Sequence, residues 1–457
     1  MGFDEAAFSR VLESFPQPTG WLLALSGGLD SSVLLHVLTV VQERHQVPLR
    51  AVHVHHGLLP HADAWSRHCE TACGQLGVPL EVVRLDLKVP SGESVEAFAR
   101  EARYAALGDR LGSGEMLLTA QHQDDQAETL LLQLLRGAGI EGLVGMPACR
   151  EWQNGWHARP LLGFSREQLQ SWAAAQGVGW VEDDSNRDRR FDRNFLRHEV
   201  LPVMRRRWPA VAATIARSAG HLASSLDVLR EEARADLAAC REGDSLDQAE
   251  LFALSAARRA LVLRAWCTSQ GYPVPDQRRM HEIERQLTHA AGSASPRIDW
   301  AGTSLRRYRE RLYLTPNPMP PKPQGRVSWT TDRKLVLPQA YGELRLRPGK
   351  KGVPARYWRE GRISVGWPEE GMRCRIPGRE GNRSLGKLCQ EWGVPPWVRP
   401  YLPLVYVDQR LVAVAGYALC GQDSAEGEAL LWPEWSGLSS GREHTSTDCE
   451  DGAGHGN

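Results

Sequence analysis

The feature that most constrains this chain of 457 residues is a glycine-containing motif that follows an apolar run near its amino terminus. The run at residues 22–25 indicates a buried strand, and the motif Ser-Gly-Gly-Leu-Asp-Ser-Ser at 26–32 follows it directly. Apolar residues then recur at helical spacing. Such a loop can hold phosphate, because glycines let the backbone come close and the amide groups and the helix dipole favour an anion.

The motif lacks the lysine of a Walker loop and the three spaced glycines of a dinucleotide fingerprint. We expect the serine hydroxyls to donate to phosphate oxygens. Asp30 is acidic, so we expect it to hold a Mg²⁺ that bridges to phosphate. The structural alternative is a Gly-Ser turn that only caps a helix. The residues predicted to bind nucleotide here are Ser26, Gly27, Gly28, Leu29, Asp30, Ser31 and Ser32.

Strand and helix patterns alternate after the motif, which predicts an α/β domain with a parallel sheet covered on both faces. Ligands bind at the carboxyl ends of the strands in such sheets. The expected strands are 49–54, 80–87 and 116–120, and the expected helices are 62–76, 94–107 and 124–135.

A second polar motif follows the expected strand at 116–120. Asp125 and Glu128 lie three residues apart on one helical face, and His122 and Asp124 lie at the turn before it. A histidine among carboxylates can hold Mg²⁺ or take a proton from an amine. An acid-rich helix start is the structural alternative, and it explains the aspartates better than it explains His122 and Glu128.

Composition is that of a globular protein, with 42% hydrophobic and 24% charged residues. No apolar run is long enough to span a membrane and no signal peptide is visible, so we expect a cytoplasmic protein without a membrane partner. The 55 basic and 55 acidic residues cancel, but the basic ones are concentrated. Residues 186–209 hold eight arginines against three acids, and residues 301–400 hold 21 basic residues against eight acids, which favours a polyanionic partner.

The motif at 26–31 matches the PP-loop of the ATP pyrophosphatase superfamily, and His-x-Asp-Asp-Gln-x-Glu-Thr at 122–129 narrows the resemblance to the tRNA(Ile)-lysidine synthetase family. Segments that resemble other signatures of this family are 96–104, 159–162, 182–186, 193–202, 387–388, 394–399, 402–405 and 412–416. The chain departs from the family pattern at Gln121, Leu59 and Asp184, where the family often has His, Arg and Pro. Gln121 can hydrogen-bond but cannot act as a base near neutral pH.

The resemblance implies a ligase that uses ATP and Mg²⁺ to adenylate C2 of the cytidine at the first anticodon position of tRNA(Ile) with a CAU anticodon. L-lysine then replaces AMP to give lysidine, which switches codon reading from AUG to AUA and identity from methionine to isoleucine. A homodimer could form. The implied catalytic residues are Asp30, Asp125 and Glu128; His122 joins the nucleotide-binding residues; and Arg100, Arg103, Arg193 and Arg197 would contact substrates.

We expect five segments along the chain. Prolines at 316–323 indicate a stiff linker, and the last residues are rich in Ser, Gly and acids. The segments are a catalytic PP-loop domain at 1–210, a mainly helical tRNA-binding domain at 211–314, the linker at 315–326, a small mixed α/β tRNA-binding domain at 327–435 and a disordered tail at 436–457.

Three other functions stay open at this stage. A PP-loop tRNA thiolation enzyme would deliver sulfur, and Cys69 and Cys73 are a weak version of the cysteine pair that it needs. A PP-loop amidotransferase or synthetase for a small molecule would not need the basic C-terminal half. A non-catalytic RNA-binding protein would not need intact acidic residues in both motifs.

Overall fold

The computed structural model describes residues 2–55, 57, 62–85, 87, 95–182, 189–289, 296–330, 334–338, 341–377, 379, 381–420 and 429–437. Leu59, Asp184 and the expected tail beyond residue 437 therefore lie outside the described residues. The chain divides into two compact units, residues 1–228 and 229–457.

The first unit contains a six-stranded sheet with the order β3-β2-β1-β4-β6-β5. All neighbours pair in parallel except β5 and β6, which are antiparallel. This confirms the predicted parallel α/β domain. The strands are β1 (Trp21–Ala24), β2 (Leu49–His55), β3 (Leu80–Arg84), β4 (Met116–Leu118), β5 (Cys149–Trp152) and β6 (Gly155–Ala158).

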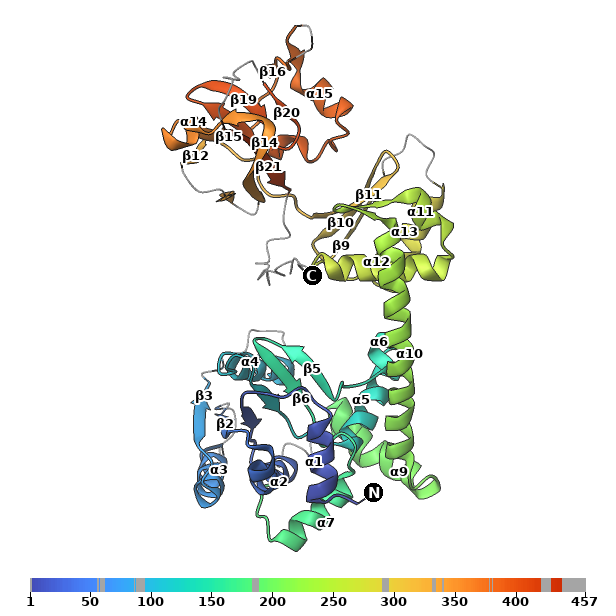
Figure 1. The fold of residues 1–457 in the computed structure, drawn as a ribbon. Coiled ribbons are helices and arrows are strands. Elements are labelled where there is room, and N and C mark those ends of the chain that lie inside the picture. The colour runs from blue at the N-terminus through green and yellow to red at the C-terminus, as the bar shows by residue number, and fades with distance from the viewer. Residues whose placement is uncertain are drawn as a thin grey trace, which may run out of the picture. The chain divides into compact units, whose positions relative to one another are not determined.

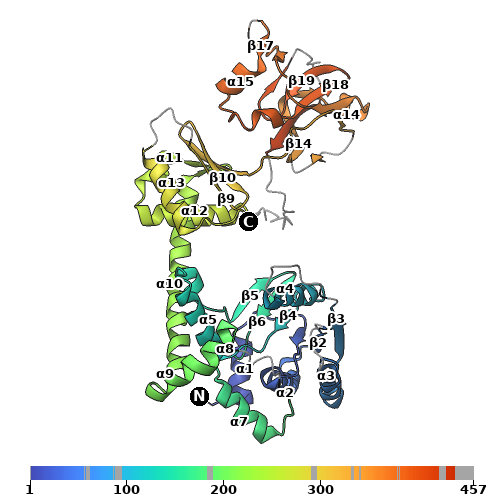
Figure 2. The same ribbon diagram turned by 180° about the vertical axis from the view of Figure 1, so that it is seen from behind.

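Both faces of this sheet are covered. Leu22 and Leu23 are fully buried, yet they belong to two different apolar clusters, because successive side chains of a strand point to opposite faces. Figures 1 and 2 show the strands lying between helices. The helices of this part are α1 (Glu5–Glu13), α2 (Leu29–His45), α3 (Ala62–Leu76), α4 (Val95–Gly108), α5 (Gln123–Leu135), α6 (Ile140–Leu143) and α7 (Arg166–Gln176).

The two polar motifs follow neighbouring strands. The PP-loop joins β1 to α2, and the second motif joins β4 to α5. Strands β1 and β4 pair in parallel with Leu23 opposite Leu118, so both motifs leave the same edge of the sheet. A helical segment after the sheet then returns to α5, and it comprises α8 (Asp192–Phe195), the π-helical turn η2 (Leu196–Val200) and α9 (Leu201–Arg207).

Helix α10 (Val211–Cys240) leads into the second unit. There, helices α11 (Gln248–Ala253), α12 (Ala256–Ser269) and α13 (Gln277–His289) accompany a five-stranded sheet with the order β7-β8-β11-β10-β9. The segment 211–314 was expected to be mainly helical; it contains these helices together with five strands that the sequence analysis did not predict. Its strands are β7 (Arg241–Glu242), β8 (Ser245–Asp247), β9 (Arg297–Trp300), β10 (Thr303–Tyr308) and β11 (Arg311–Pro316).

The rest of the second unit is built mainly of antiparallel strands, in sheets ordered β12-β15-β18-β19-β20, β13-β14-β21 and β16-β17. Its elements are β12 (Val327–Ser328), β13 (Lys334–Val336), β14 (Glu343–Pro354), α14 (Arg356–Arg359), β15 (Ile363–Gly366), β16 (Arg373–Cys374), β17 (Arg383–Ser384), α15 (Leu385–Glu391), η4 (Arg399–Tyr401), β18 (Leu404–Val407), β19 (Arg410–Val414), β20 (Ala418–Leu419) and β21 (Leu430–Ser436).

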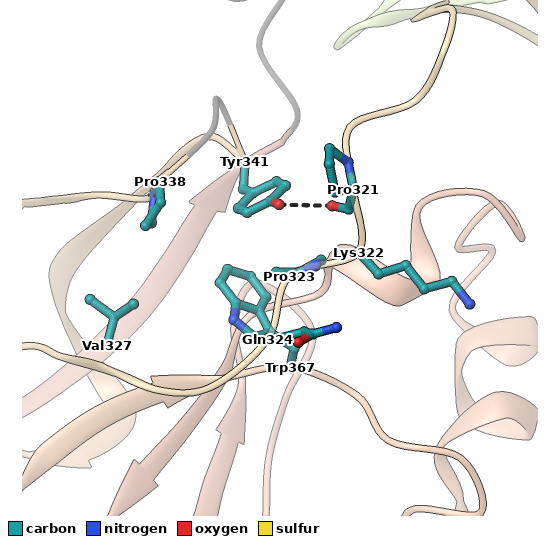
Figure 3. A pocket seen from close by; sticks show the side chains of 8 residues that line it. All are labelled: Pro321, Lys322, Pro323, Gln324, Val327, Pro338, Tyr341 and Trp367. Carbon is teal, nitrogen blue, oxygen red and sulfur yellow. Dashed lines mark hydrogen bonds between the residues drawn. The ribbon is translucent and has the colours of Figure 1, made fainter.

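The proline-rich segment is held against these strands at two points. The Tyr341 hydroxyl donates to the carbonyl of Pro321 at 2.7 Å, and the Tyr401 hydroxyl donates to that of Pro320 at 2.5 Å. A pocket of about 340 Å³ lies beside the segment, with Trp367 among its walls (Figure 3). Aromatic side chains that contact a proline-rich stretch are typical of polyproline recognition, so the segment predicted as a linker is anchored at its C-terminal end.

Candidate active site

The PP-loop is shaped by Ser31, which is 4% exposed. The Ser31 hydroxyl accepts the backbone N–H groups of Ser26 and Gly27, at 3.2 Å each, and donates to the carbonyl of Gly28 at 3.1 Å. Ser32 donates to the carbonyl of Gly27 at 3.4 Å. The hydroxyls of Ser31 and Ser32 thus hold the loop in its conformation. The groups that remain to bind a phosphate are the backbone amides in the first turn of α2.

The start of α2 has the features of an anion site. Gly28 precedes the helix without a side-chain cap, so the first amide groups of α2 lack an intrahelical acceptor. Gly27 has a φ of 84°, and a Cβ added there would lie 3.1 Å from the Sγ atom of Cys69. The carbonyl of Gly27 accepts the backbone N–H of Val181 at 2.9 Å. Glycine is therefore required at position 27 for both conformation and space.

His122 lies between carboxylates at the start of α5. Its Nε2 atom is 3.6 Å from Asp30 Oδ2 and 3.4 Å from Asp125 Oδ2. The imidazole is 1% exposed, and Asp125 also accepts the backbone N–H of His122 at 3.0 Å. The structure therefore brings Asp30 of the PP-loop and Asp125 of the second motif to one imidazole, as parallel pairing of β1 and β4 requires.

Charge interactions fix the protonation of this group. Burial alone would lower the pKa of His122, but Asp125 and Asp30 outweigh it and raise that pKa above its usual value. Burial would raise the pKa of Asp125, but His122 and Arg197 outweigh it and lower that pKa. Asp125 therefore stays ionised, which suits a ligand for a cation better than a base that works near neutral pH.

Glu128 lies about one helical turn after Asp125 on α5 and is fully buried. Its carboxylate accepts Arg193 Nε at 3.0 Å and, from Arg197, Nε at 2.6 Å and Nη2 at 2.9 Å. Arg197 Nη2 also donates to Asp125 at 2.8 Å. We call Glu128, Arg193 and Arg197 the Glu128 clamp. The two arginines, which the sequence analysis assigned to substrate, therefore reach the site through α8 and η2 and are already paired with its carboxylates.

Asp124, the other acid at the helix start, joins elements of the fold. It accepts the backbone N–H of Arg166 at 2.9 Å and forms an ion pair with Arg205 of α9. It is 7% exposed. Asp124 thus ties the start of α7 and the basic segment of α9 to the start of α5, and Arg205 is held by a carboxylate in this structure.

Three known families match along the chain. The PP-loop domain matches residues 4–204, the TilS substrate binding domain matches 246–313, and the TilS substrate C-terminal domain matches 363–435. The tRNA(Ile)-lysidine synthase of Coxiella burnetii is 40% identical over 424 residues, which cover 93% of this chain and 94% of that protein. This chain belongs to the tRNA(Ile)-lysidine synthase family.

The tRNA(Ile)-lysidine synthase of Methylococcus capsulatus is 42% identical over 402 residues, covering 86% of this chain and 90% of that protein. Among solved structures, the U34-tRNA thiolase NcsA from Methanococcus maripaludis is similar at a TM-score of 0.40 and 15% identity, over 48% of this chain and 77% of that one. The family match confirms an ATP-dependent ligase with a PP-loop. Within the part of the chain that the structure describes, no helix is both long and apolar enough to cross a membrane.

A divalent cation fits the acidic side of this lysidine synthase site. The Oδ1 atom of Asp30 is buried and accepts no hydrogen bond from the described residues, so its lone pairs are available to a cation. Mg²⁺ is commonly held by one or two carboxylates together with phosphate oxygens. Asp30 offers such a carboxylate next to the phosphate loop.

The remaining predicted residues lie on α4. Arg100 and Arg103 are exposed, and the guanidinium of Arg100 lies 5.1 Å from the ring centre of Tyr104. Their role toward substrate stays a prediction. Sequence reasoning missed the buried polar residues Thr119 and His157, because neither belongs to a motif with catalytic spacing.

Cys69 and Cys73 do not have the chemistry of sulfur transfer. Both thiols are buried, and burial raises their pKa values to about 12 and about 11. Sulfur chemistry needs a thiolate that a partner can reach. Cys69 instead packs beside Gly27 and lies 3.6 Å from Nδ1 of His53.

We predict that Gly27→Ala weakens ATP binding at least tenfold. A side chain at this φ costs about 1–2 kcal/mol, and the added methyl group would also press on Cys69. Isothermal titration with ATP and Mg²⁺ measures the effect. Gly74→Ala is the matched control, because Gly74 lies in α3 with no atom near its added Cβ. Equal ATP affinities for the two variants would contradict the role assigned to Gly27.

We predict that Glu128→Gln lowers the free energy of unfolding by about 2 kcal/mol, since it leaves two partly buried guanidinium groups without their carboxylate. It should also lower the turnover of folded enzyme more than tenfold, because the clamp arginines lose their positions. Denaturant titration and pyrophosphate release measure the two effects.

Glu115→Gln is the control for this prediction. Glu115 forms an ion pair with Arg50 at 2.5 Å and precedes β4, at the opposite edge of the sheet from the PP-loop. It should lower stability and leave turnover per folded molecule unchanged. An equal loss of turnover in both variants would show that the Glu128 clamp has no specific role.

Proposed function

We propose that this chain is a tRNA(Ile)-lysidine synthase that adenylates the cytidine at the first anticodon position of tRNA(Ile) and joins L-lysine to it. The observation that carries this proposal is the meeting of the PP-loop with His122, Asp30 and Asp125 at the ends of two paired strands. The match to lysidine synthases over most of the chain supports the same substrate pair.

The reaction has two steps that suit these residues. In the first, the C2 oxygen of cytosine attacks the α-phosphorus of ATP, the bond between the α- and β-phosphates breaks, and pyrophosphate leaves. The amide groups at the start of α2 and the PP-loop backbone bind the phosphates and stabilise the charge that develops on them. Asp30 would hold Mg²⁺, which neutralises phosphate charge when it is bound.

In the second step the ε-amine of lysine attacks C2, and AMP leaves with the oxygen. The amine arrives as an ammonium group near neutral pH; it gives one proton to solvent before it attacks and a second proton to solvent as AMP leaves. Asp125 is ionised and open enough to bind this ammonium group, and its side chain is 15% exposed. Glu128 has no exposed surface, so we assign it a positioning role: it holds Arg193 and Arg197.

The clamp arginines offer a second recognition element for lysine. Their side chains are 31% and 24% exposed, so part of each guanidinium group faces away from Glu128. A carboxylate is the natural ligand of such a group. A cation-binding Asp125 beside two arginines therefore matches an amino acid that carries an ammonium group at one end and a carboxylate at the other.

The tRNA would be bound mainly through charge. Residues 205–207 are three successive arginines at the end of α9, and the excess of basic residues between 301 and 400 lies in the second unit. Phosphate contacts position an RNA without reading its sequence, so the CAU anticodon must be recognised by its exposed bases. A tRNA substrate and ATP as co-substrate support the expected location in the cytoplasm.

We expect purified protein to release pyrophosphate from ATP and Mg²⁺ only with unmodified tRNA(Ile) carrying a CAU anticodon. Mass spectrometry of the digested RNA should show one cytidine that has gained lysine with loss of water, and only when lysine is present. A transcript with a UAU anticodon is the control and should give neither product. Release that ignores RNA would leave a small-molecule ligase, and an exchange of oxygen for sulfur would indicate a thiolation enzyme.

We also expect Cys73→Ala to retain lysidine formation within about twofold, because a buried protonated thiol contributes packing and not chemistry. The same nucleoside assay measures it, with thermal unfolding as a check on folding. Cys267→Ala is the matched control, since Cys267 is another buried thiol with a raised pKa but lies in the second unit. Loss of activity confined to the Cys73 variant would favour sulfur chemistry.

A further inference from the structure

A line of buried polar side chains runs along the sheet toward the site and belongs to neither motif. Arg159 Nη2 lies 3.3 Å from His157 Nδ1, and His157 Nε2 lies 2.8 Å from Thr119 Oγ1. The Thr119 hydroxyl donates to Gln121 Oε1 at 2.6 Å. Arg159, His157 and Thr119 are 5%, 0% and 6% exposed, and Gln121 is half-buried. We call these four residues the Gln121 relay.

The hydrogen bonds of the relay can be donated in one direction only, from Arg159 toward Gln121. Arg159 can only donate, so His157 Nδ1 must accept and the imidazole proton lies on Nε2. That N–H then donates to Thr119 Oγ1, which leaves the single hydroxyl proton of Thr119 for Gln121. Burial and the charge of Arg159 lower the pKa of His157 to about 3, so the imidazole is neutral as this arrangement requires.

This direction fixes what Gln121 can offer. Its carbonyl oxygen is used by Thr119, so the amide is oriented and its NH₂ group is the end that remains for a ligand. A flipped amide would place its NH₂ group against the Thr119 oxygen and leave the hydroxyl proton without an acceptor within the relay. Arg159 therefore orients the Gln121 amide through His157 and Thr119, so that Gln121 presents a hydrogen-bond donor.

The sheet register places this donor beside the phosphate loop. Leu23 pairs with Leu118, so Ser26 and Gln121 each lie three residues beyond the same pair of neighbouring strands. Neighbouring strands are about 4.8 Å apart. Gln121 also directly precedes His122, whose imidazole faces Asp30 and Asp125. Gln121 is therefore at the same end of the sheet as the phosphate loop, where phosphate and base oxygens would meet under the proposed function.

We propose that Gln121 is a substrate-binding residue whose amide N–H donates to an acceptor oxygen at the adenylation centre, and that Thr119, His157 and Arg159 are its positioning residues. This inference rests on the proposed reaction and deepens it. The acceptor is an oxygen of the ATP phosphates or the C2 oxygen of cytosine, which share the same hydrogen-bond chemistry. A donor to either oxygen stabilises charge that develops during transfer of AMP.

The test compares Thr119→Val with Thr119→Ser. Valine keeps the shape of threonine without its hydroxyl, whereas serine keeps the hydroxyl. We expect Thr119→Val and Gln121→Ala each to lower kcat for lysidine formation about tenfold, the effect of one lost hydrogen bond to a charged group. Thr119→Ser should stay near wild type. The double variant Thr119→Val/Gln121→Ala should be no slower than Gln121→Ala alone, because the two residues act as one unit.

Titration with ATP in the absence of RNA identifies the acceptor. Weaker ATP binding by Gln121→Ala would assign the donor to a phosphate oxygen, and unchanged ATP binding with a lower kcat would assign it to the base. Gln123→Ala is the matched control, because Gln123 is half-buried like Gln121 but its side chain donates to the carbonyl of Gly163 instead of joining the relay. It should match wild type in kcat and in ATP affinity.

A purely structural relay gives a different result. In that case Thr119→Val and Thr119→Ser would show equal kcat per folded molecule, or the two losses in the double variant would simply add, and the inference would be overturned. If Thr119→Val does not fold, Gln121→Glu decides, since it replaces the donor by an acceptor at a half-buried position and should lower kcat at least as much as Gln121→Ala. A wild-type protein that forms no lysidine would refute the proposed function itself.

Discussion

The parallel pairing of β1 with β4 is the interaction on which the site depends. It sends the PP-loop and the start of α5 off the same edge of the sheet, and thereby sets Asp30 and Asp125 within 3.6 Å of one imidazole nitrogen. Two carboxylates held this close need a compensating cation, and His122 supplies it through its raised pKa. The strand pairing thus also sets the electrostatics of the site. It brings the carboxylates of Asp30 and Asp125 close together, and the imidazole of His122 offsets the repulsion between them.

The Glu128 clamp is a second group of opposite charges next to this one. One buried carboxylate holds two arginines that come from a helical segment more than 60 residues away in the chain. Removing any member would leave a charge with poor solvation, which explains why three charged side chains pack where apolar ones would be simpler. The same segment ends in Arg205 to Arg207, so the Glu128 clamp and the arginines proposed to bind RNA are built on one helical segment.

Local pattern was enough to predict the strands before both motifs, the parallel sheet and the motif residues that meet at its edge. The local pattern could not predict the Glu128 clamp, because an ion pair between Glu128 and Arg197 does not change the spacing of apolar residues. It predicted a mainly helical segment at 211–314 and did not distinguish the hairpin of β10 and β11 within that segment. The Gln121 relay was not predicted either, because Thr119 and His157 come into contact only when β4 pairs with β6.

The anchored prolines have a consequence for the RNA binding proposed above. Strand β11 ends at Pro316, and the carbonyl of Pro320 is bonded to Tyr401, so the connection within the second unit is short. At ~3.5 Å per residue its contour length is about 14 Å. An RNA bound on one side of such a tether meets the other side at a high effective concentration. Two weak basic surfaces can therefore act with the avidity of one strong surface.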